Sequence, residues 1–172
     1  IADTAKEIGY DALEIQMRNP HKMDVVGMKK ICQERGLDIC GIATGMEATK
    51  NGFCLTSEDE TLRKASIAKF KEYIDLAKYW DCPAVMGLMR GNLPDPALYD
   101  KYYDRLVDLT KDCCQEAEKK GATIVFEAMN IYCVNWINNI KDSTDFIRSV
   151  GSPALKIHID THHMNIDEKS ME

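Results

Sequence analysis

The stretch EKKGATIVFEAMN, residues 118–130, contains the end of a helix, a strand and a polar rim in direct succession. Two lysines close an amphipathic helix, and Gly121 ends it because glycine readily adopts the left-handed conformation of a helix stop. The apolar run at 122–128 then predicts a strand, with Glu127 at its carboxyl end and Asn130 just beyond. The stretch therefore predicts a strand that delivers polar groups to one edge of a sheet.

The same order of helix, stop, strand and polar loop occurs five times along the chain. The strands are near-continuous apolar runs, as expected where helices cover one face of a sheet and a core fills the other. Regular alternation of helices and strands predicts parallel strands joined by right-handed crossovers, and hence an α/β fold. The five predicted strands cover residues 11–16, 37–42, 84–89, 122–128 and 154–160.

Cap residues mark where the predicted helices begin. The first helix, IADTAKEIG, is expected to bury Ile1, Ala5 and Ile8 and to stop at Gly9. The other predicted start signals are Asp24 for the second helix, a capping box of Ser57 with Glu60 for the third, Asp95 with Pro96 for the fourth and Ser143 for the fifth.

Polar residues gather just after the ends of the predicted strands, and they decide between two parallel architectures. No glycine-rich phosphate loop follows any strand, which disfavours an open nucleotide-binding sheet. A (β/α)8 barrel, or TIM barrel, places its active site at the carboxyl ends of its strands. We therefore predict a TIM barrel, because this chain has the following residues at those ends: Glu14, Arg90, Glu127, Asn130, Asp160 and His163.

The chain is short for a complete barrel. A (β/α)8 barrel usually needs about 250 residues, whereas this chain has 172 residues and five predicted strands. We expect residues 1–172 to form a single domain, a partial barrel that supplies the second to the sixth strand. One strand is expected before Ile1 and two after Glu172, so that these residues alone would be inactive.

Two carboxylates stand at the ends of neighbouring predicted strands. Side chains alternate along a strand, so Glu127 shares a face with Val125, and Asp160 shares a face with His158. Adjacent parallel strands lie about 5 Å apart, and two carboxylates at that separation repel each other strongly without a cation. Because divalent metals prefer oxygen ligands of this kind, the sequence predicts that Glu127 and Asp160 hold one.

The segment Glu127-Ala-Met-Asn130 and, about thirty residues later, the segment Asp160-Thr-His-His163-Met-Asn-Ile-Asp-Glu168 resemble the xylose-isomerase-like barrels. The closest likeness is to the ketose 3-epimerases of the D-tagatose/D-psicose type and to related sugar-phosphate isomerases and epimerases. The resemblance implies a sugar or sugar phosphate as the substrate. It also implies manganese, cobalt or magnesium as the metal, with zinc less favoured.

The resemblance further implies roles for individual residues. In such enzymes a glutamate after the fifth strand and an aspartate after the sixth ligate the metal, and they match Glu127 and Asp160. A histidine after the seventh strand and a glutamate after the eighth complete the metal site. Glu127 would also be one of two acid/base carboxylates that move a proton next to a carbonyl through a cis-enediolate. His163 would bind the substrate near its carbonyl.

Two positions depart from the tagatose-type pattern. A second glutamate that contacts substrate is expected six residues after Glu127, where this chain has Cys133, and an arginine is expected where it has Ile131. The implied class is therefore a metal-dependent sugar isomerase or epimerase rather than a 3-epimerase in particular. Hydroxypyruvate isomerase, inosose dehydratase and sugar-phosphate epimerase activities stay open.

Further residues are candidates for substrate contact. Asn130 could orient Glu127 or touch the substrate. Arg90 could bind a substrate hydroxyl or phosphate, or form a salt bridge within its loop, and Trp136 could form a wall of the sugar site. Structural roles are expected for the remaining acid and histidines near the strand ends: Glu14, His158 and His162.

The composition argues against several classes of partner and compartment. A net charge of −6 repels phosphate backbones, so nucleic acid is not an expected partner. No apolar run approaches the roughly 18 residues of a membrane helix. The seven cysteines are odd in number and form no CxxC pair, which favours reduced thiols and a cytoplasmic location.

Two alternatives to the isomerase remain at this point. A zinc-dependent apurinic-site endonuclease shares the barrel, but it needs extra histidines after earlier strands, and the loops ATGMEATKNG and GLMRGN contain none. A non-catalytic or regulatory barrel would lose its metal ligands, whereas Glu127 and Asp160 are present. An exposed barrel edge would favour a homo-oligomer.

Overall fold

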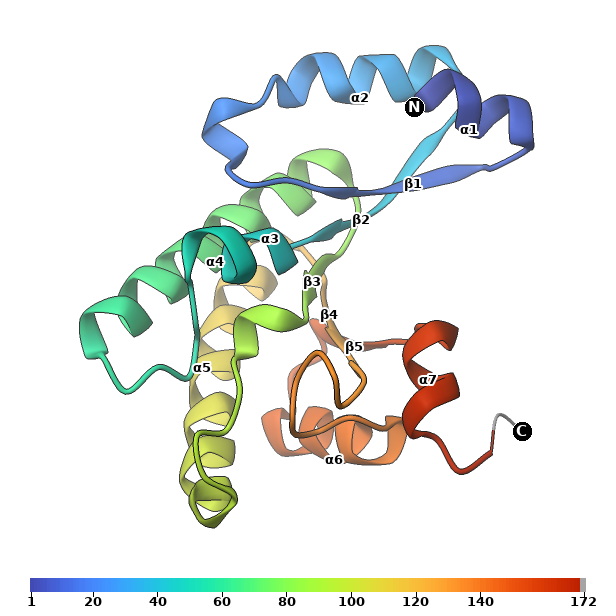
Figure 1. The fold of residues 1–172 in the computed structure, drawn as a ribbon. Helices are drawn as coiled ribbons and strands as arrows, with labels where there is room; N and C mark the ends of the chain where they lie inside the picture. Colours follow the sequence, from blue (N-terminus) through green and yellow to red (C-terminus); the bar gives the residue numbers. More distant parts are fainter. Residues whose placement is uncertain (171–172) are drawn as a thin grey trace.

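The computed structural model of the chain describes residues 1–170 and contains one parallel sheet of five strands. Each strand pairs with the next strand along the chain, so the spatial order follows the sequence (Figure 1). This order and the curved arrangement in Figure 1 agree with the predicted partial barrel. The strands are β1 (Ala12–Gln16), β2 (Asp38–Ala43), β3 (Ala84–Met86), β4 (Ile124–Glu127) and β5 (Leu155–His158).

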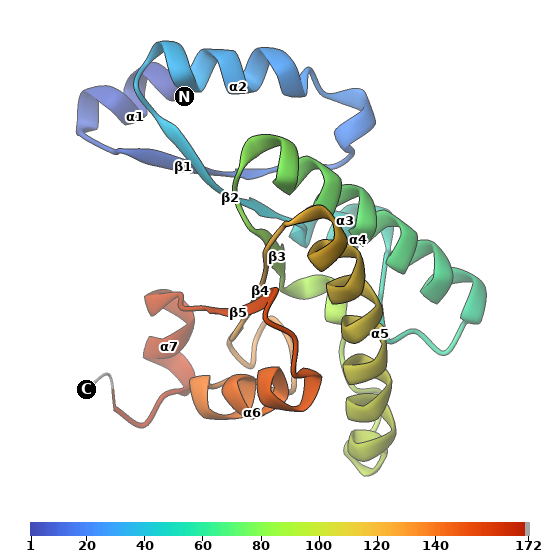
Figure 2. The same ribbon diagram turned by 180° about the vertical axis from the view of Figure 1, so that it is seen from behind.

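The helices pack mainly on one face of this sheet, where α4 and α5 lie side by side (Figure 2). Two short helices, α3 and α7, instead follow directly from the carboxyl ends of β2 and β5. The helices are α1 (Ala2–Ile8), α2 (Val25–Glu34), α3 (Gly45–Asn51), α4 (Glu60–Trp80), α5 (Tyr99–Lys120), α6 (Ile140–Val150) and α7 (Thr161–Asp167). Three 3-10 turns are η1 (Pro20–Lys22), η2 (Leu88–Arg90) and η3 (Pro96–Leu98). Among the described residues, no helix is long and apolar enough to cross a membrane.

Alternation along the strands separates a core face from a functional face. Ile124 and Phe126 of β4 are fully buried and belong to the same core as Phe70 of α4 and Phe146 of α6. Val125 and Glu127, which alternate with them along β4, point the opposite way. The strand therefore ends with the half-buried Glu127 on the face away from the helices. The alternation of side chains that places Ile124 and Phe126 in the core therefore also directs the carboxylate of Glu127 away from it.

Two helix starts differ from the sequence prediction. The predicted capping box of Ser57 with Glu60 is wrong, because Asp59 caps α4 and accepts hydrogen bonds from the backbone N–H groups of Thr61 and Leu62. The predicted cap Ser143 is also wrong. Asn139 caps α6 and accepts a hydrogen bond from the N–H of Asp142, so the helix begins earlier and Ser143 is buried inside it. At α4 the cap lies two residues after the predicted serine, and at α6 it lies four residues before it; in both cases a carboxylate or amide oxygen takes the place of the serine hydroxyl.

Two further boundaries and the buried face of the first helix are corrected. The third strand ends at Met86, because the chain then turns into η2 instead of continuing to residue 89. Asp95 with Pro96 begins the 3-10 turn η3, and α5 starts only at Tyr99. In α1 only Ala5 is buried, whereas Ile1 and Ile8 are exposed, since the alanine side of this helix packs against the core. The predicted stop at Gly9 and the predicted cap Asp24 are confirmed.

Candidate metal centre at the carboxyl end of the sheet

Three potential ligands meet where β4 and β5 end. Glu127 is the last residue of β4 and pairs in parallel register with His158 of β5. Asp160 follows two residues later, and His163 lies in the first turn of α7. One ligand atom from each of Glu127, Asp160 and His163 lies within 4.8 Å of the others. The structure thus brings together three of the side chains that the sequence predicts at the strand ends.

Asp160 does two things with its two carboxylate oxygens. Oδ1 accepts a hydrogen bond from the N–H of His162 at 2.8 Å and so caps α7. Oδ2 lies 3.8 Å from Nε2 of His163, on the side of the cluster. The sequence predicted Asp160 as the last residue of the strand, but β5 ends at His158 and Asp160 instead caps α7. Its second carboxylate oxygen stays available to a cation.

Asn130 fixes the orientation of His163. Its Oδ1 accepts a hydrogen bond from the N–H of Tyr132, which leaves Nδ2 facing Nδ1 of His163 at 2.7 Å. Because an amide nitrogen only donates, Nδ1 accepts, and the proton of a neutral imidazole is then on Nε2. That Nε2 lies 3.6 Å from Oε1 of Glu127. Asn130 thus orients the histidine rather than Glu127, and it is itself buried.

Burial shifts the pKa values of Glu127 and His163 in favour of their neutral forms. Burial is the largest cause that raises the pKa of Glu127, and nearby Glu14 and Asp160 raise it further, whereas His158 lowers it. Burial likewise lowers the pKa of His163, with Asp160 acting in the opposite direction. A neutral imidazole beside two carboxylates supplies no positive charge, so a bound cation would relieve their repulsion.

Gly87 leaves room for the carboxylate of Glu127. A Cβ atom at Gly87 would lie 2.6 Å from Oε2 of Glu127 and 3.0 Å from the sulfur of Met129. Only glycine fits without displacing one of them. The oxygen-rich donor set and this close fit agree with a small divalent cation held by Glu127 and Asp160.

Arg90 lies behind the site rather than in it. Its side chain is wholly buried and donates hydrogen bonds to the carbonyl oxygens of Glu127 at 2.5 Å, Trp136 at 3.3 Å and Ile137 at 3.2 Å. The guanidinium carbon also lies 4.8 Å from the centre of the Phe126 ring. Burial lowers the pKa of Arg90 to about 9, which still leaves it positively charged at neutral pH. Arg90 therefore donates hydrogen bonds to backbone carbonyl oxygens instead of making the expected contact with substrate.

Trp136 is likewise a packing residue in this structure. It is 3% exposed, its Nε1 donates to the carbonyl oxygen of Gly91 at 2.8 Å, and its ring meets the Tyr99 ring edge-on. The expectation that it forms a wall of the sugar site is not met, because its polar atom faces the backbone and its ring faces the core.

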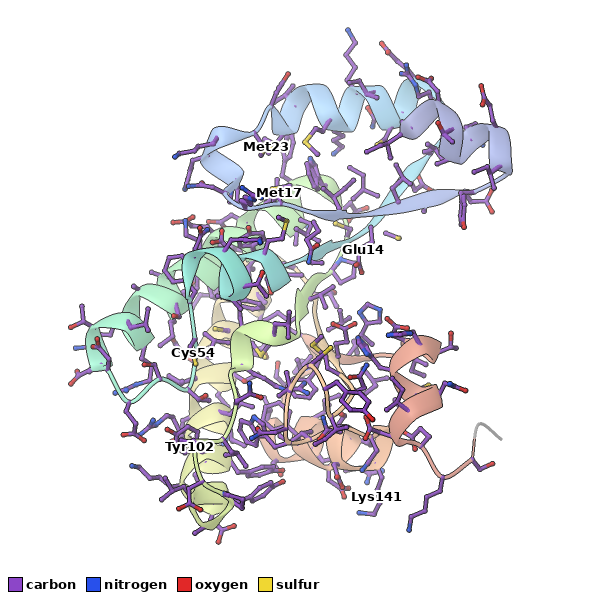
Figure 3. The ribbon with its side chains drawn as sticks, viewed as in Figure 1. Glu14, Met17, Met23, Cys54, Tyr102 and Lys141 are labelled. Carbon is purple, nitrogen blue, oxygen red and sulfur yellow. The ribbon has the colours of Figure 1, made fainter. Side chains whose placement is uncertain are left out.

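A pocket of about 180 Å³ opens beside the ligand cluster, and we call it the mouth pocket. Glu14 of β1, labelled in Figure 3, was predicted to be structural, but its side chain lines this pocket. Sequence reasoning missed several of the other lining residues, although their positions at the ends of β1, β2 and β3 could have indicated them. The lining includes Glu14, Gln16, Thr44, Leu88, Glu127 and His163.

Comparisons with known proteins agree with this geometry. The chain is 28% identical over 171 residues to an L-ribulose 3-epimerase from Methylomonas sp., covering 97% of this chain and 58% of the relative. It is 26% identical over 178 residues to a D-psicose 3-epimerase from Enterocloster bolteae, covering 98% and 58%. The crystal structure of a Methylomonas sp. D-allulose 3-epimerase in complex with D-allulose superimposes with a TM-score of 0.79 at 25% identity, covering 99% of this chain and 58% of that one.

The chain thus spans a little more than half the length of the curated relatives that it matches. A family profile matches residues 2–172, almost the whole sequence. Its description as a TIM barrel agrees with the five parallel strands. The chain belongs to the xylose isomerase-like TIM barrel family.

Proposed function

We propose that this chain carries the metal corner of a divalent-metal-dependent sugar isomerase or epimerase that acts on a ketose. The observation that carries the proposal is the meeting of Glu127, Asp160 and His163 at the carboxyl end of a parallel sheet. The relatives are named as 3-epimerases of ketoses. Their names support a ketose as the substrate and inversion of configuration at carbon 3 as the reaction.

Glu127 and Asp160 are the residues that would hold manganese, cobalt or magnesium. Each offers one carboxylate oxygen that no hydrogen bond of the cluster uses, namely Oε1 of Glu127 and Oδ2 of Asp160. A bound divalent metal would polarise the ketose carbonyl and acidify the neighbouring C–H group. The resemblance implies two further ligands, a histidine after the seventh strand and a glutamate after the eighth strand of such barrels.

His163 is proposed to bind substrate rather than metal. The hydrogen bond from Asn130 makes Nδ1 an acceptor, so Nε2 presents its proton toward the mouth of the site. A donor in that position can hold a substrate oxygen next to the reacting carbon. Metal ligation by Nε2 would require the other tautomer and would leave the Asn130 amide facing an N–H group.

Glu127 is the proposed proton-transfer residue. Burial raises the pKa of Glu127 in the absence of a metal, and a carboxylate at the end of the strand is a suitable group to accept a proton from a carbon next to a carbonyl. It lies on the rim of the mouth pocket, within reach of a sugar that the metal and His163 hold in place. Glu127 would take the proton beside the carbonyl and give a cis-enediolate, and a second carboxylate would return a proton on the opposite face.

A cytoplasmic location is also proposed. All seven cysteines of the chain lie within the described residues and have free thiols, and burial raises the pKa of Cys113 to about 12. Protonated, unpaired thiols of this kind are typical of proteins in reducing compartments.

The test compares the full-length protein with its Asp160→Asn and Glu127→Gln variants. Asparagine still caps a helix, so Asp160→Asn removes charge while the start of α7 is kept. Manganese affinity from calorimetric titration should fall at least tenfold in each variant. Ketose epimerisation by the metal-loaded protein should fall with it, and the thermal midpoint of the metal-free protein should move little.

Unchanged manganese binding in both variants would contradict the assigned ligands. Normal metal binding without turnover of any ketose would instead favour a non-catalytic barrel that has kept its metal site.

A further inference from the structure

A second pocket lies next to the mouth pocket and shares one lining residue with it. This outer pocket has a volume of about 270 Å³ and lies between α3, η2 and the loop after β4. Leu88 of η2 lines both pockets. A Cβ atom on Gly45 would lie 3.3 Å from Cδ1 of Leu88, so the leucine side chain lies against the start of α3. The outer pocket is lined by residues that include Ala48, Phe53, Cys54, Leu88, Cys133 and Val134.

The lining of the outer pocket is uncharged. Among its described lining residues there is no acidic or basic side chain, and the polar ones are largely engaged. Oγ1 of Thr49 donates to the carbonyl oxygen of Gly45, and Oδ1 of Asn92 accepts from the N–H of Asn135. A phosphate or carboxylate needs charge-assisted donors and is costly to desolvate without them. The pocket therefore suits a neutral, partly apolar group.

Hydrogen bonds between loops hold the walls of this pocket in place. Oγ1 of Thr56 donates to the carbonyl oxygen of Arg90 at 2.6 Å, and the N–H of Leu55 donates to that of Met89 at 2.7 Å. The segment that carries Cys54, labelled in Figure 3, is thereby fixed to η2. The hydroxyl of Ser66 on α4 also accepts a hydrogen bond from the N–H of Cys54. A pocket formed in advance binds a ligand with less loss of conformational freedom.

We propose that the outer pocket binds an uncharged extension of the ketose, which passes Leu88 while the reacting carbons stay beside Glu127. The inference rests on the proposed function and narrows its substrate class. The substrate is a neutral ketose that carries an uncharged substituent at one end, and not a sugar phosphate. Leu88 and Cys133 are then residues that determine specificity.

The test measures the binding of defined sugars to the manganese-loaded protein by calorimetry. The probes are D-fructose, its 1-O-benzyl and 6-O-benzyl ethers, and its 1- and 6-phosphates. At least one benzyl ether should bind at least tenfold more tightly than D-fructose, and neither phosphate should. The same ether should slow the alkylation of the exposed Cys133 thiol by iodoacetamide, a readout that does not depend on turnover.

A matched pair of variants locates the effect. Cys133→Trp fills the outer pocket and should reduce the preference for the benzyl ether over D-fructose at least tenfold. Tyr132→Trp places the same indole on the neighbouring residue, which is 85% exposed and does not line the pocket, and should change that preference less than twofold.

Two kinds of failure can be told apart. Binding of D-fructose without preference for either ether, an equal effect of the two tryptophan variants, or tighter binding of a phosphate would overturn the outer-pocket proposal alone. Failure of every sugar to bind the manganese-loaded protein would overturn the proposed function and this inference together.

Discussion

At the scale of the residue, the site depends on what its neighbours leave free. Asp160 caps a helix with one oxygen and keeps the other for the cluster, and His163 receives its orientation from Asn130. Gly87 contributes by the absence of a side chain next to Glu127. Each of these contacts sets the direction of a functional atom, so small substitutions beside the ligands should affect metal binding more than stability.

Gly87→Ala tests the space beside Glu127. The added methyl group would meet Oε2 of Glu127 at 2.6 Å and should displace the carboxylate. Manganese affinity measured by titration should fall roughly 10- to 100-fold, as is usual for changes next to a metal ligand. Gly52→Ala serves as the control, since it lies in open space and its positive φ should cost stability only. Wild-type affinity in Gly87→Ala would show that the carboxylate position is not confined by this glycine.

The sequence predicted which residues converge but not how all of them are used. Glu127, Asp160 and His163 could be found because strand parity and a short motif place them at one edge. The roles of Arg90 and Trp136 could not, because they depend on the path of the loop after β4. In that loop Ile137 adopts a left-handed φ of 53°, unusual for a branched residue, and its carbonyl oxygen accepts a hydrogen bond from Arg90.

At the scale of the element, acidic or amide side chains cap the starts of α2, α4, α6 and α7, and ion pairs join α4 to α5. Periodicity in the sequence located every strand, because apolar runs and glycine stops are local signals. The exact caps of α4 and α6 were missed, because several residues near each start could serve and backbone geometry chooses among them.

The start of α4 can be tested with single alanine substitutions. Asp59→Ala removes the acceptor for two backbone N–H groups and should lower the free energy of unfolding by about 1 kcal/mol. Ser57→Ala should cost less, because the serine hydroxyl accepts only from the N–H of Asp59. Urea unfolding followed by circular dichroism measures both, and a larger loss for Ser57→Ala would restore the capping box.

The connection between α5 and the loop before α4 should make stability depend on pH. Hydrogen bonds from Lys101, Tyr102 and Arg105 lower the pKa of Glu58 to about 2. Because the pKa is lower in the folded state, the stabilisation is complete above the ordinary value of 4.5 and disappears as the pH falls toward 2. The thermal midpoint of Glu58→Gln should therefore lie below that of the wild type at pH 7, and the gap should close between about pH 4.5 and 2.

Glu60→Gln is the control for this pH effect. Glu60 pairs with Lys64 within the same helix, so its loss removes no link between elements and should produce a smaller gap. A gap for Glu58→Gln that persists at pH 2 would show that its cause is not the charge of the carboxylate.

At the scale of the whole molecule, the sheet as described ends at β1 and β5, and each end strand carries backbone groups on its outer side without a strand partner. Ile159, directly after β5, is 55% exposed. Exposed strand edges with apolar neighbours pair readily with other chains. The fold class followed from the alternation of elements, whereas the state of these edges depends on long-range closure that no local pattern encodes.

Association should follow from these edges. Sedimentation velocity of these 172 residues should show self-association that grows with concentration, and Ile159→Lys should weaken it by placing a charge beside β5. Ile31→Lys, on the outer side of α2 and away from β5, should leave it unchanged. A single monomeric species at all concentrations would show that the edges do not associate.

The hydrogen bonds from Arg90 to the backbone affect how the sequence of the loop after β4 can change in evolution. Arg90 binds carbonyl oxygens of Glu127, Trp136 and Ile137, and every amino acid has a carbonyl oxygen. Side chains elsewhere in the loop, Cys133 among them, can therefore be exchanged by mutation without loosening the end of β4. Under the proposed function, selection could alter the range of accepted sugars at one residue after another while the carboxylate at the strand end stays in place.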